Sequence, residues 1–189
     1  MVFMVVSSLG VAQSEGERPK ILTVCEVLAN ASQYRDAAIA IVGRLVRRVG
    51  TIDGFEFLTQ DGCKKPVVTK KHIWPNELLI SDLAESDLPQ PPTVHPKLST
   101  EIVANKLAAV RRSTRLGTHK EPIDSRKAAK VPNQWAVVYG RVFIPPNLGK
   151  EPCEIGSGGF IGAPMIIMSD SKNIRILNED GTENRSSDQ

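Results

Sequence analysis

The sequence predicts a mainly β protein with some helix. The expected core is a five-stranded antiparallel barrel, with one helix before its first strand and another between strands three and four. Three observations predict this class. Hydrophobic residues change from helical spacing over residues 23–32 to alternation over residues 37–49. Three strand-like segments, separated by Asp-Gly turns, lie between residues 37 and 74. Two further apolar segments, near residues 135 and 165, follow a long connection that contains a helical pattern.

The first twelve residues have the composition of a signal peptide. They carry no charge, are mostly apolar and end in small residues before Gln13, without a basic start. We therefore predict that residues 1–12 are a truncated signal peptide, that residues 13–20 are a linker, and that the protein is exported to the periplasm or secreted. The alternative is a buried strand or an apolar N-terminus in a cytoplasmic protein. No segment reaches the about 18 consecutive apolar residues of a membrane span.

A short helix is predicted to begin after Thr23. Thr23 and Glu26 have the spacing of a capping box, in which each side chain accepts a hydrogen bond from the backbone of the other residue. Val24, Val27 and Leu28 fall on one face of this helix, and the pattern ends near residue 30. The helix is therefore amphipathic.

The first three strands are predicted at residues 37–49, 55–60 and 66–74. Gly43 lies inside the apolar run of the first strand, which is typical of a strand that bends at the corner of a barrel. Short turns connect the three strands, so they form a meander. Residues 75–98 are rich in proline and acidic residues, and they are predicted to be an irregular insertion over the surface.

The second helix is predicted to begin at Ser99 or Thr100 and to end before Gly117. One stripe of this helix is apolar and consists of Ile102, Val103, Leu107, Val110 and Leu116. The opposite face is rich in lysine and arginine, so the helix lies in the most basic part of the chain. The stripe is predicted to pack on the core, and contact of this helix with anionic lipid is the alternative.

The last barrel strands are predicted at residues 133–145 and 164–170. The segment VYGRVF in the first of these echoes IVGRLV in the opening strand, and both place a Gly-Arg pair in the middle of an apolar run. Two strands that bend at a central glycine suit a closed barrel. The glycine-rich loop at residues 154–164 lacks the strand-loop-helix context of a nucleotide-binding loop. Residues 178–189 are polar and acidic, and they are predicted to be a disordered tail.

Three cysteines allow one disulfide in an oxidising compartment. Cys25 at the start of the first helix and Cys63 after the second strand are the candidate pair, because a bridge there would join the helix to the sheet. Cys153 is then left over. Three free thiols, as in a cytoplasmic protein, are the alternative. The cysteine spacing has no Cys-x-x-Cys and no neighbouring histidine, so neither a metal site nor a cofactor is predicted.

The order of these elements is that of an OB-like barrel, which we expect as a single domain over residues 21–177. Seven positions near the start of that domain form a pattern, which consists of Val24, Cys25, Leu28, Tyr34, Ile39, Ile41 and Gly43. Together with GSGGFIGAPMIIM near the end, this pattern resembles that of small exported bacterial proteins with an OB-like fold and no assigned function. The resemblance covers residues 21–63 and 131–168. It implies a fold and a compartment, and it implies no activity.

The function predicted from the residues is that of a binding or interaction module. No nucleophile, base or metal set converges in the sequence, so we predict no catalytic site and no enzyme. OB-like barrels bind oligosaccharides or oligonucleotides. The candidate binding residues are basic residues of the predicted strands: Arg44, Arg47, Lys70 and Arg141. A cell-envelope component or a protein is the preferred partner. Single-stranded nucleic acid is the alternative, disfavoured by export and by an aromatic content of only 5%.

Overall fold

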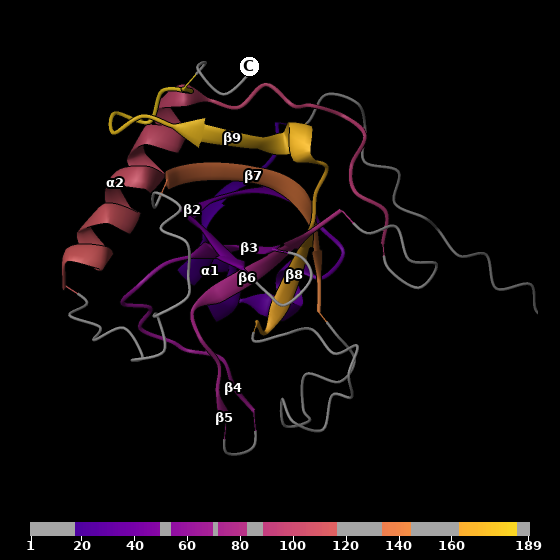
Figure 1. The fold of residues 1–189 in the computed structure, drawn as a ribbon, viewed down its shortest axis with the longest axis vertical. Helices are drawn as coiled ribbons and strands as arrows, with labels where there is room; N and C mark the ends of the chain where they lie inside the picture. Colours follow the sequence, from indigo (N-terminus) through magenta and orange to yellow (C-terminus); the bar gives the residue numbers. More distant parts are fainter. Residues whose placement is uncertain are drawn as a thin grey trace, which may run out of the picture.

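The computed structural model describes residues 18–49, 54–69, 72–82, 89–116, 134–144 and 163–184. Five strands in this part of the chain close into a barrel, which confirms the predicted mainly β class (Figure 1). In spatial order they are β2 (Ala38–Val49), β3 (Gly54–Thr59), β6 (Glu77–Ser81), β8 (Met165–Met168) and β7 (Gln134–Phe143). The pairing of β7 with β2 closes the ring.

One pair of neighbours in the barrel is parallel, which differs from the predicted antiparallel arrangement. β6 pairs with β8 in parallel, and the other barrel pairs are antiparallel. The reason is geometric, because a closed ring with an odd number of strands cannot alternate direction at every step. The resulting order, with the third and fifth barrel strands side by side, is consistent with an OB-like barrel.

The two Gly-Arg pairs mark the positions where long strands exchange neighbours. β2 pairs with β1 (Ile21–Thr23) as far as Val42 and with β3 from Arg44 onward. β7 pairs with β9 (Ile174–Leu177) and then with β8, and Gly140 lies between the two ladders. An added Cβ atom would lie 2.7 Å from Leu58 Cγ at Gly43 and 2.5 Å from Ile167 Cγ1 at Gly140. Each strand can bend there only because no side chain occupies the inside of the corner.

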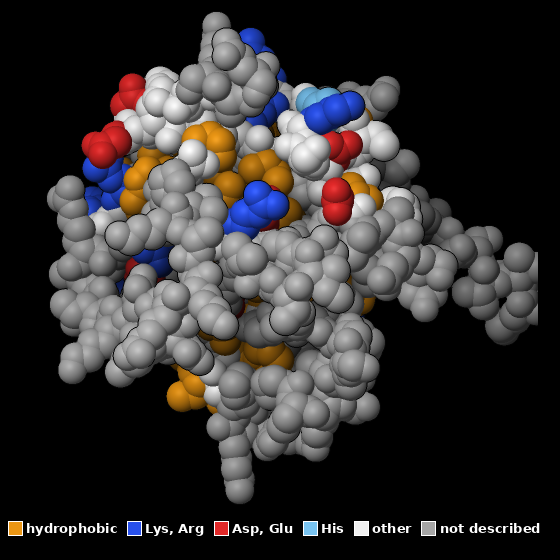
Figure 2. Space-filling view, viewed as in Figure 1, with side chains coloured by type: hydrophobic (Ala, Val, Ile, Leu, Met, Phe, Trp, Pro, Cys, Tyr) orange, Lys and Arg blue, Asp and Glu red, His pale blue; other side chains and the backbone are white. Residues whose placement is uncertain are grey.

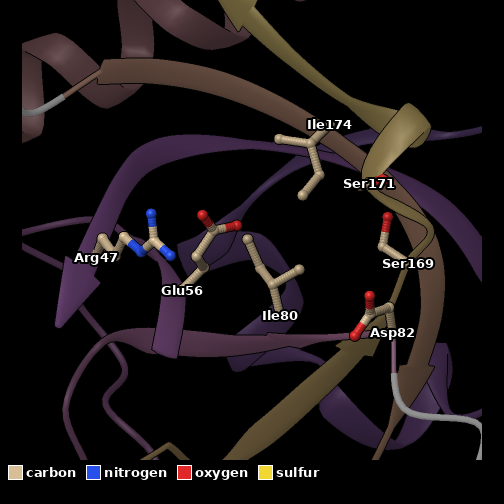
Figure 3. A pocket seen from close by; sticks show the side chains of 7 residues that line it. All are labelled: Arg47, Glu56, Ile80, Asp82, Ser169, Ser171 and Ile174. Carbon is tan, nitrogen blue, oxygen red and sulfur yellow. The ribbon is translucent and has the colours of Figure 1, made fainter. Parts of the chain in front are cut away.

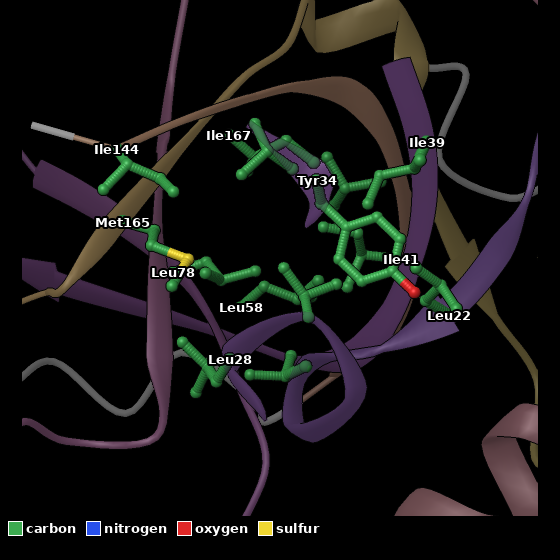
Figure 4. Close-up of a cluster of buried hydrophobic side chains, with 14 of the residues drawn as sticks. Leu22, Leu28, Tyr34, Ile39, Ile41, Leu58, Leu78, Ile144, Met165 and Ile167 are labelled. Carbon is green, nitrogen blue, oxygen red and sulfur yellow. The ribbon is translucent and has the colours of Figure 1, made fainter. Parts of the chain in front are cut away.

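Helix α1 (Val24–Ala29) packs against one end of the barrel interior. The Thr23 and Glu26 capping box forms as predicted, and the helix ends at Asn30. Val24, Val27 and Leu28 are buried together with inward-facing side chains of the strands (Figure 4). The strand residues in this cluster include Ile41, Leu58, Leu78, Met165 and Ile167. The main hydrophobic core therefore lies inside the barrel and is closed at one end by α1.

Helix α2 (Thr100–Leu116) packs on the outside of the barrel wall. The carbonyl of Ser99 accepts the first helical hydrogen bond from Val103 N at 3.0 Å, so the helix begins where it was predicted to begin. Val103, Leu107 and Val110 are buried against side chains of β1, β2, β7 and β9. Val103, Leu107 and Val110 thus belong to the core as predicted, whereas Ile102 is 46% exposed and the side chain of Leu116 lies outside the described part of the structure. In the described residues no helix has the length and apolar character needed to cross a membrane.

The third barrel strand lies later in the chain than predicted. Residues 66–74 contain only a short hairpin, formed by β4 (Val68–Thr69) and β5 (His72–Ile73), in a separate two-stranded sheet. The barrel strand is β6, inside the segment that was predicted to be an irregular insertion. The prolines that motivated that prediction lie at Pro75 and beyond residue 88, so the apolar run between them is free to join the ladder.

The predicted disordered tail is ordered over its first seven residues, 178–184. Asn178 N donates to the carbonyl of Thr182 at 2.8 Å, and Leu177 forms a bridge with Glu183. Gly181 lies against α2, where an added Cβ would come within 2.6 Å of Ala104 Cα. A polar sequence does not prevent order when its backbone is hydrogen-bonded and packed. The predicted signal peptide, the first part of the linker, Cys153 and residues 154–162 of the glycine-rich loop lie outside the described residues.

An ion pair joins the two helices and gives a testable pH dependence. Lys106 Nζ lies 2.6 Å from Glu26 Oε1, and Thr23 N donates to Glu26 Oε2 at 2.7 Å. Burial raises the pKa of Glu26, but the hydrogen bonds from Lys106 and Thr23 and the charge of Lys106 outweigh it. The net pKa therefore lies below its ordinary value of 4.5. A lowered carboxyl pKa contributes stability that is complete above the unfolded-state pKa and is lost as pH falls through the folded-state pKa.

We expect Glu26→Gln to lower the free energy of unfolding by about 1 kcal/mol at neutral pH, a modest value because the pair is partly exposed to solvent. The difference from the unmodified protein should shrink as the pH falls below 4.5 and be lost once the pH passes below the lowered pKa of folded Glu26. Urea denaturation at several pH values measures it. Glu101→Gln, in the exposed first turn of α2, is the matched control. An unchanged difference at low pH would contradict the assignment.

Candidate binding pocket at the open end of the barrel

The two ends of the barrel differ in what covers them. β3 ends at Thr59 beside α1, where Cys25 N donates to Gln60 Oε1 at 3.0 Å. The opposite end is where β3 begins and β6 ends, and a pocket of about 220 Å³ opens there (Figure 3). Its lining consists of Arg47, Glu56, Ile80, Asp82, Ser169, Ser171 and Ile174. We call this set of residues the mouth pocket.

The mouth pocket forms because the inward faces of the strands change from apolar to polar toward this end. On β2, Arg47 lies on the same face as Ile41, and on β3, Glu56 lies on the same face as the buried Leu58. Ile80 continues the inward face of β6 and is followed by Asp82. The apolar core therefore forms the floor of the pocket, and charged side chains form its rim.

Opposite charges lie next to each other across the pocket. Arg47 and Glu56 are directly opposed partners in the β2–β3 ladder, and Glu56 is in turn opposed to Ile80 on β6. Directly opposed residues project to the same face of a sheet. The pocket thus presents a guanidinium and a carboxylate side by side, with the carboxylate of Asp82 on the other side of Ile80 (Figure 3).

Two serines complete the lining on the side of β8 and β9. Ser169 is 1% exposed, and its hydroxyl donates to the carbonyl of Tyr139 at 2.8 Å. The hydroxyl proton of Ser169 is therefore used in a hydrogen bond within the protein, while the hydroxyl oxygen can still accept a hydrogen bond. Ser171 follows Asp170, whose carboxylate accepts a hydrogen bond from Lys172 N at 2.9 Å. That hydrogen bond lowers the pKa of Asp170 and fixes the short helical turn at residues 171–173.

The groups of the mouth pocket can bind a ligand that is partly polar and partly apolar. They can accept or donate hydrogen bonds and can pair with charges of either sign, above an apolar floor. The buried hydroxyl of Ser169 donates its hydrogen bond to a backbone carbonyl. A backbone carbonyl is not a general base. Within the described ranges, no group of three or more His, Cys, Asp and Glu is placed to hold a metal ion.

The structure does not bring together the three candidate basic residues that it describes. Of these three, only Arg47 lines the mouth pocket. Arg44 Nη2 lies 3.7 Å from Asp61 Oδ2, and Arg141 Nη1 donates to the carbonyl of Asp36 at 2.9 Å. Lys70 lies outside the described residues. Arg44 and Arg47 are an odd number of residues apart on one strand, so their side chains lie on opposite faces and cannot form one surface.

Two further polar residues of the pocket, Glu56 and Ser169, were not singled out from the sequence. Glu56 alternates with Phe55 and Phe57, and that pattern favours an interior phenylalanine face. In the structure Phe57 is buried in a separate cluster with Leu79 and Ile166, on the outer side of the barrel wall. The signal that could have identified Glu56 is its position two residues before Leu58, the aliphatic residue of β3. Residues two apart on a strand lie on the same face.

The structure contains the candidate disulfide, between Cys25 and Cys63. The bridge ties α1 to the segment that follows β3, which is the role expected for it.

No family model, curated protein or solved structure matches the chain. The function must therefore be argued from the fold, the mouth pocket and the surface.

Proposed function

We propose that the protein is an exported binding module, without catalytic activity, whose ligand enters the mouth pocket. The supporting observation is that Arg47 and Glu56 face into the open end of the barrel, above its apolar interior. Arg47 is exposed and Glu56 is half-buried. A ligand that enters the pocket can therefore pair with both charges.

The proposed compartment rests on the disulfide and on the composition of the N-terminus. Disulfides persist in oxidising compartments and are rare in the cytosol, so the Cys25–Cys63 bridge supports export. The uncharged apolar residues at the start of the chain support the same proposal. The ligand should therefore be a component of the cell envelope.

The lining of the mouth pocket favours a saccharide that carries amino or carboxyl groups. OB-like barrels bind oligosaccharides as well as oligonucleotides. Here two carboxylates, from Glu56 and Asp82, stand against the single guanidinium of Arg47. Carboxylates accept hydrogen bonds from hydroxyl and ammonium groups, whereas they repel phosphates. The apolar floor of Ile80 and Ile174 can contact the C–H face of a sugar ring.

We expect saturable binding of soluble cell-wall glycan fragments, made of amino sugars with short peptides, in isothermal titration calorimetry. Glu56→Gln and Asp82→Asn should each weaken binding about tenfold, the effect of removing a hydrogen bond to a charged group. Glu101→Gln, an exposed charge removal on α2, is the matched control and should leave binding unchanged.

A twelve-nucleotide thymidine strand distinguishes the alternative ligand class. At low salt we expect no binding that depends on Arg44 and Arg47 together, because they lie on opposite faces of β2. Tight, salt-sensitive binding of this strand would favour the nucleic-acid function instead. Glycan binding that is equal in Glu56→Gln, Asp82→Asn and the unmodified protein would reject the mouth pocket as the site.

A further inference from the structure

The hairpin of β4 and β5 projects from the end of the barrel that α1 closes, below the barrel in Figure 1. Its base is anchored in the fold. Val67 packs against the core cluster, Trp74 is 3% exposed, and Trp74 N donates to the carbonyl of Val67 at 2.9 Å. Cys63 also packs on the core and is bonded to α1 through the disulfide. The hairpin is thus fixed to the barrel at its base and projects from it.

The outer side of this hairpin is apolar. Val68 and Ile73 are directly opposed in the β4–β5 ladder, so they project to the same face. Val68 is 58% exposed and Ile73 is 67% exposed. Ile73 is the most exposed of the large hydrophobic residues in the described part of the chain. Hydrophobic side chains are visible at the lower edge of the molecule in Figure 2, where the hairpin projects. Isolated exposed aliphatic residues are ordinary, but this directly opposed pair, one register position before the Thr69–His72 pair, forms a small apolar patch near the tip of the hairpin.

The tip lies in a segment of uniformly positive charge. Residues 62–76 contain four lysines and no Asp or Glu. Lys64 and Lys65, in front of β4, are both exposed. The acidic residues that flank this segment add little opposing charge to the surface, because Asp61 lies 3.7 Å from Arg44 Nη2 and Glu77 is 3% exposed.

We propose that this hairpin docks the protein on an anionic lipid surface. Val68 and Ile73 enter the interface between headgroups and acyl chains, and Lys64 and Lys65 contact lipid phosphates. Lysines that flank exposed apolar side chains complement such a surface in both charge and polarity. A protein partner fits less well, because the narrow tip alone cannot bury the roughly 800 Å² per partner of a standard protein interface.

The docked orientation leaves the mouth pocket accessible. β3 begins at the mouth pocket and ends toward the hairpin, and β6 runs back from the hairpin to the mouth pocket. The two sites therefore lie at opposite ends of the barrel. With the hairpin on the membrane, the mouth pocket is not part of the contact surface, because none of its lining residues belongs to the hairpin. Lipid docking rests on different residues from the proposed glycan binding, so either function can fail alone.

The test is co-sedimentation of the full chain with large unilamellar vesicles, either pure phosphatidylcholine or phosphatidylcholine with phosphatidylglycerol. We expect the protein to pellet only with the anionic vesicles, and to be released by high salt. Lys64→Ser with Lys65→Ser should weaken partitioning about fivefold for each lysine removed. Val68→Ser with Ile73→Ser should weaken it about tenfold or more, since two aliphatic side chains no longer leave water.

Matched controls carry the same changes elsewhere on the surface. Val94→Ser with Ile102→Ser removes two exposed aliphatic side chains, and Lys97→Ser with Lys172→Ser removes two exposed lysines. Both controls, and Arg47→Ala in the mouth pocket, should partition as the unmodified protein does. No pelleting with anionic vesicles at low salt would overturn the proposal. It would also be overturned if hairpin and control variants lost partitioning equally, with circular dichroism spectra showing all of them folded.

Discussion

Replacing Cys25 and Cys63 by serine is expected to lower the free energy of unfolding by about 4 kcal/mol. The bridge closes a loop between residues separated by 38 positions, and without it the unfolded chain regains the conformational freedom that the loop removes. The loss also detaches α1 from the segment that follows β3. For a chain of this size the midpoint of thermal unfolding should fall by about 10 °C.

Chemical denaturation of the double variant in urea measures this loss. Cys153→Ser is the matched control, because it removes a thiol without touching the bridge, and we expect it to be neutral. Adding a reductant to the unmodified protein should reproduce the stability of the double variant. A double variant as stable as the unmodified protein would mean that α1 is held by packing alone.

Placing a methyl group at Gly140 is expected to destabilise the barrel by about 3 kcal/mol, at the upper end of the usual cost of overpacking. The added carbon in Gly140→Ala would lie 2.5 Å from Ile167 Cγ1 and 2.6 Å from the carbonyl oxygen of Met168. Ile167 is fully buried, and the Met168 carbonyl belongs to β8, so neither can move freely. The strand corner at β7 must therefore open or the β7–β8 ladder must separate.

Urea denaturation of Gly140→Ala gives the size of this effect, and Gln134→Val is the control on the same strand. Gln134 is exposed at the start of β7, so a branched side chain there should change stability by less than about 0.5 kcal/mol. We expect Gly43→Ala to cost less than Gly140→Ala, since the closest atom at Gly43 is a side-chain carbon of Leu58 at 2.7 Å. A neutral Gly140→Ala would contradict the packing described for this corner.

Local patterns in the sequence were sufficient for several elements. The Thr23 and Glu26 capping box, the long strand around Gly43 and the start of α2 depend on neighbouring residues, and all three form where they were predicted. The repeated Gly-Arg pair also had a structural meaning that the sequence could indicate, a bend in each of two long strands. The disulfide was one of two alternatives from the sequence, and the tertiary structure decided between them by placing Cys25 beside Cys63.

The tertiary structure decided which face of each strand lies inside the barrel, and therefore where the candidate site is. A period of two divides a strand into two faces without saying which one is interior. On β3 both faces are buried, by Leu58 inside and Phe57 outside, so hydrophobicity could not separate them. Only the closed ring shows that Glu56 and Arg47 share the mouth pocket while Arg44 points away from it. Burial depends on contacts between distant segments, and those contacts have no counterpart in the spacing of residues along one strand.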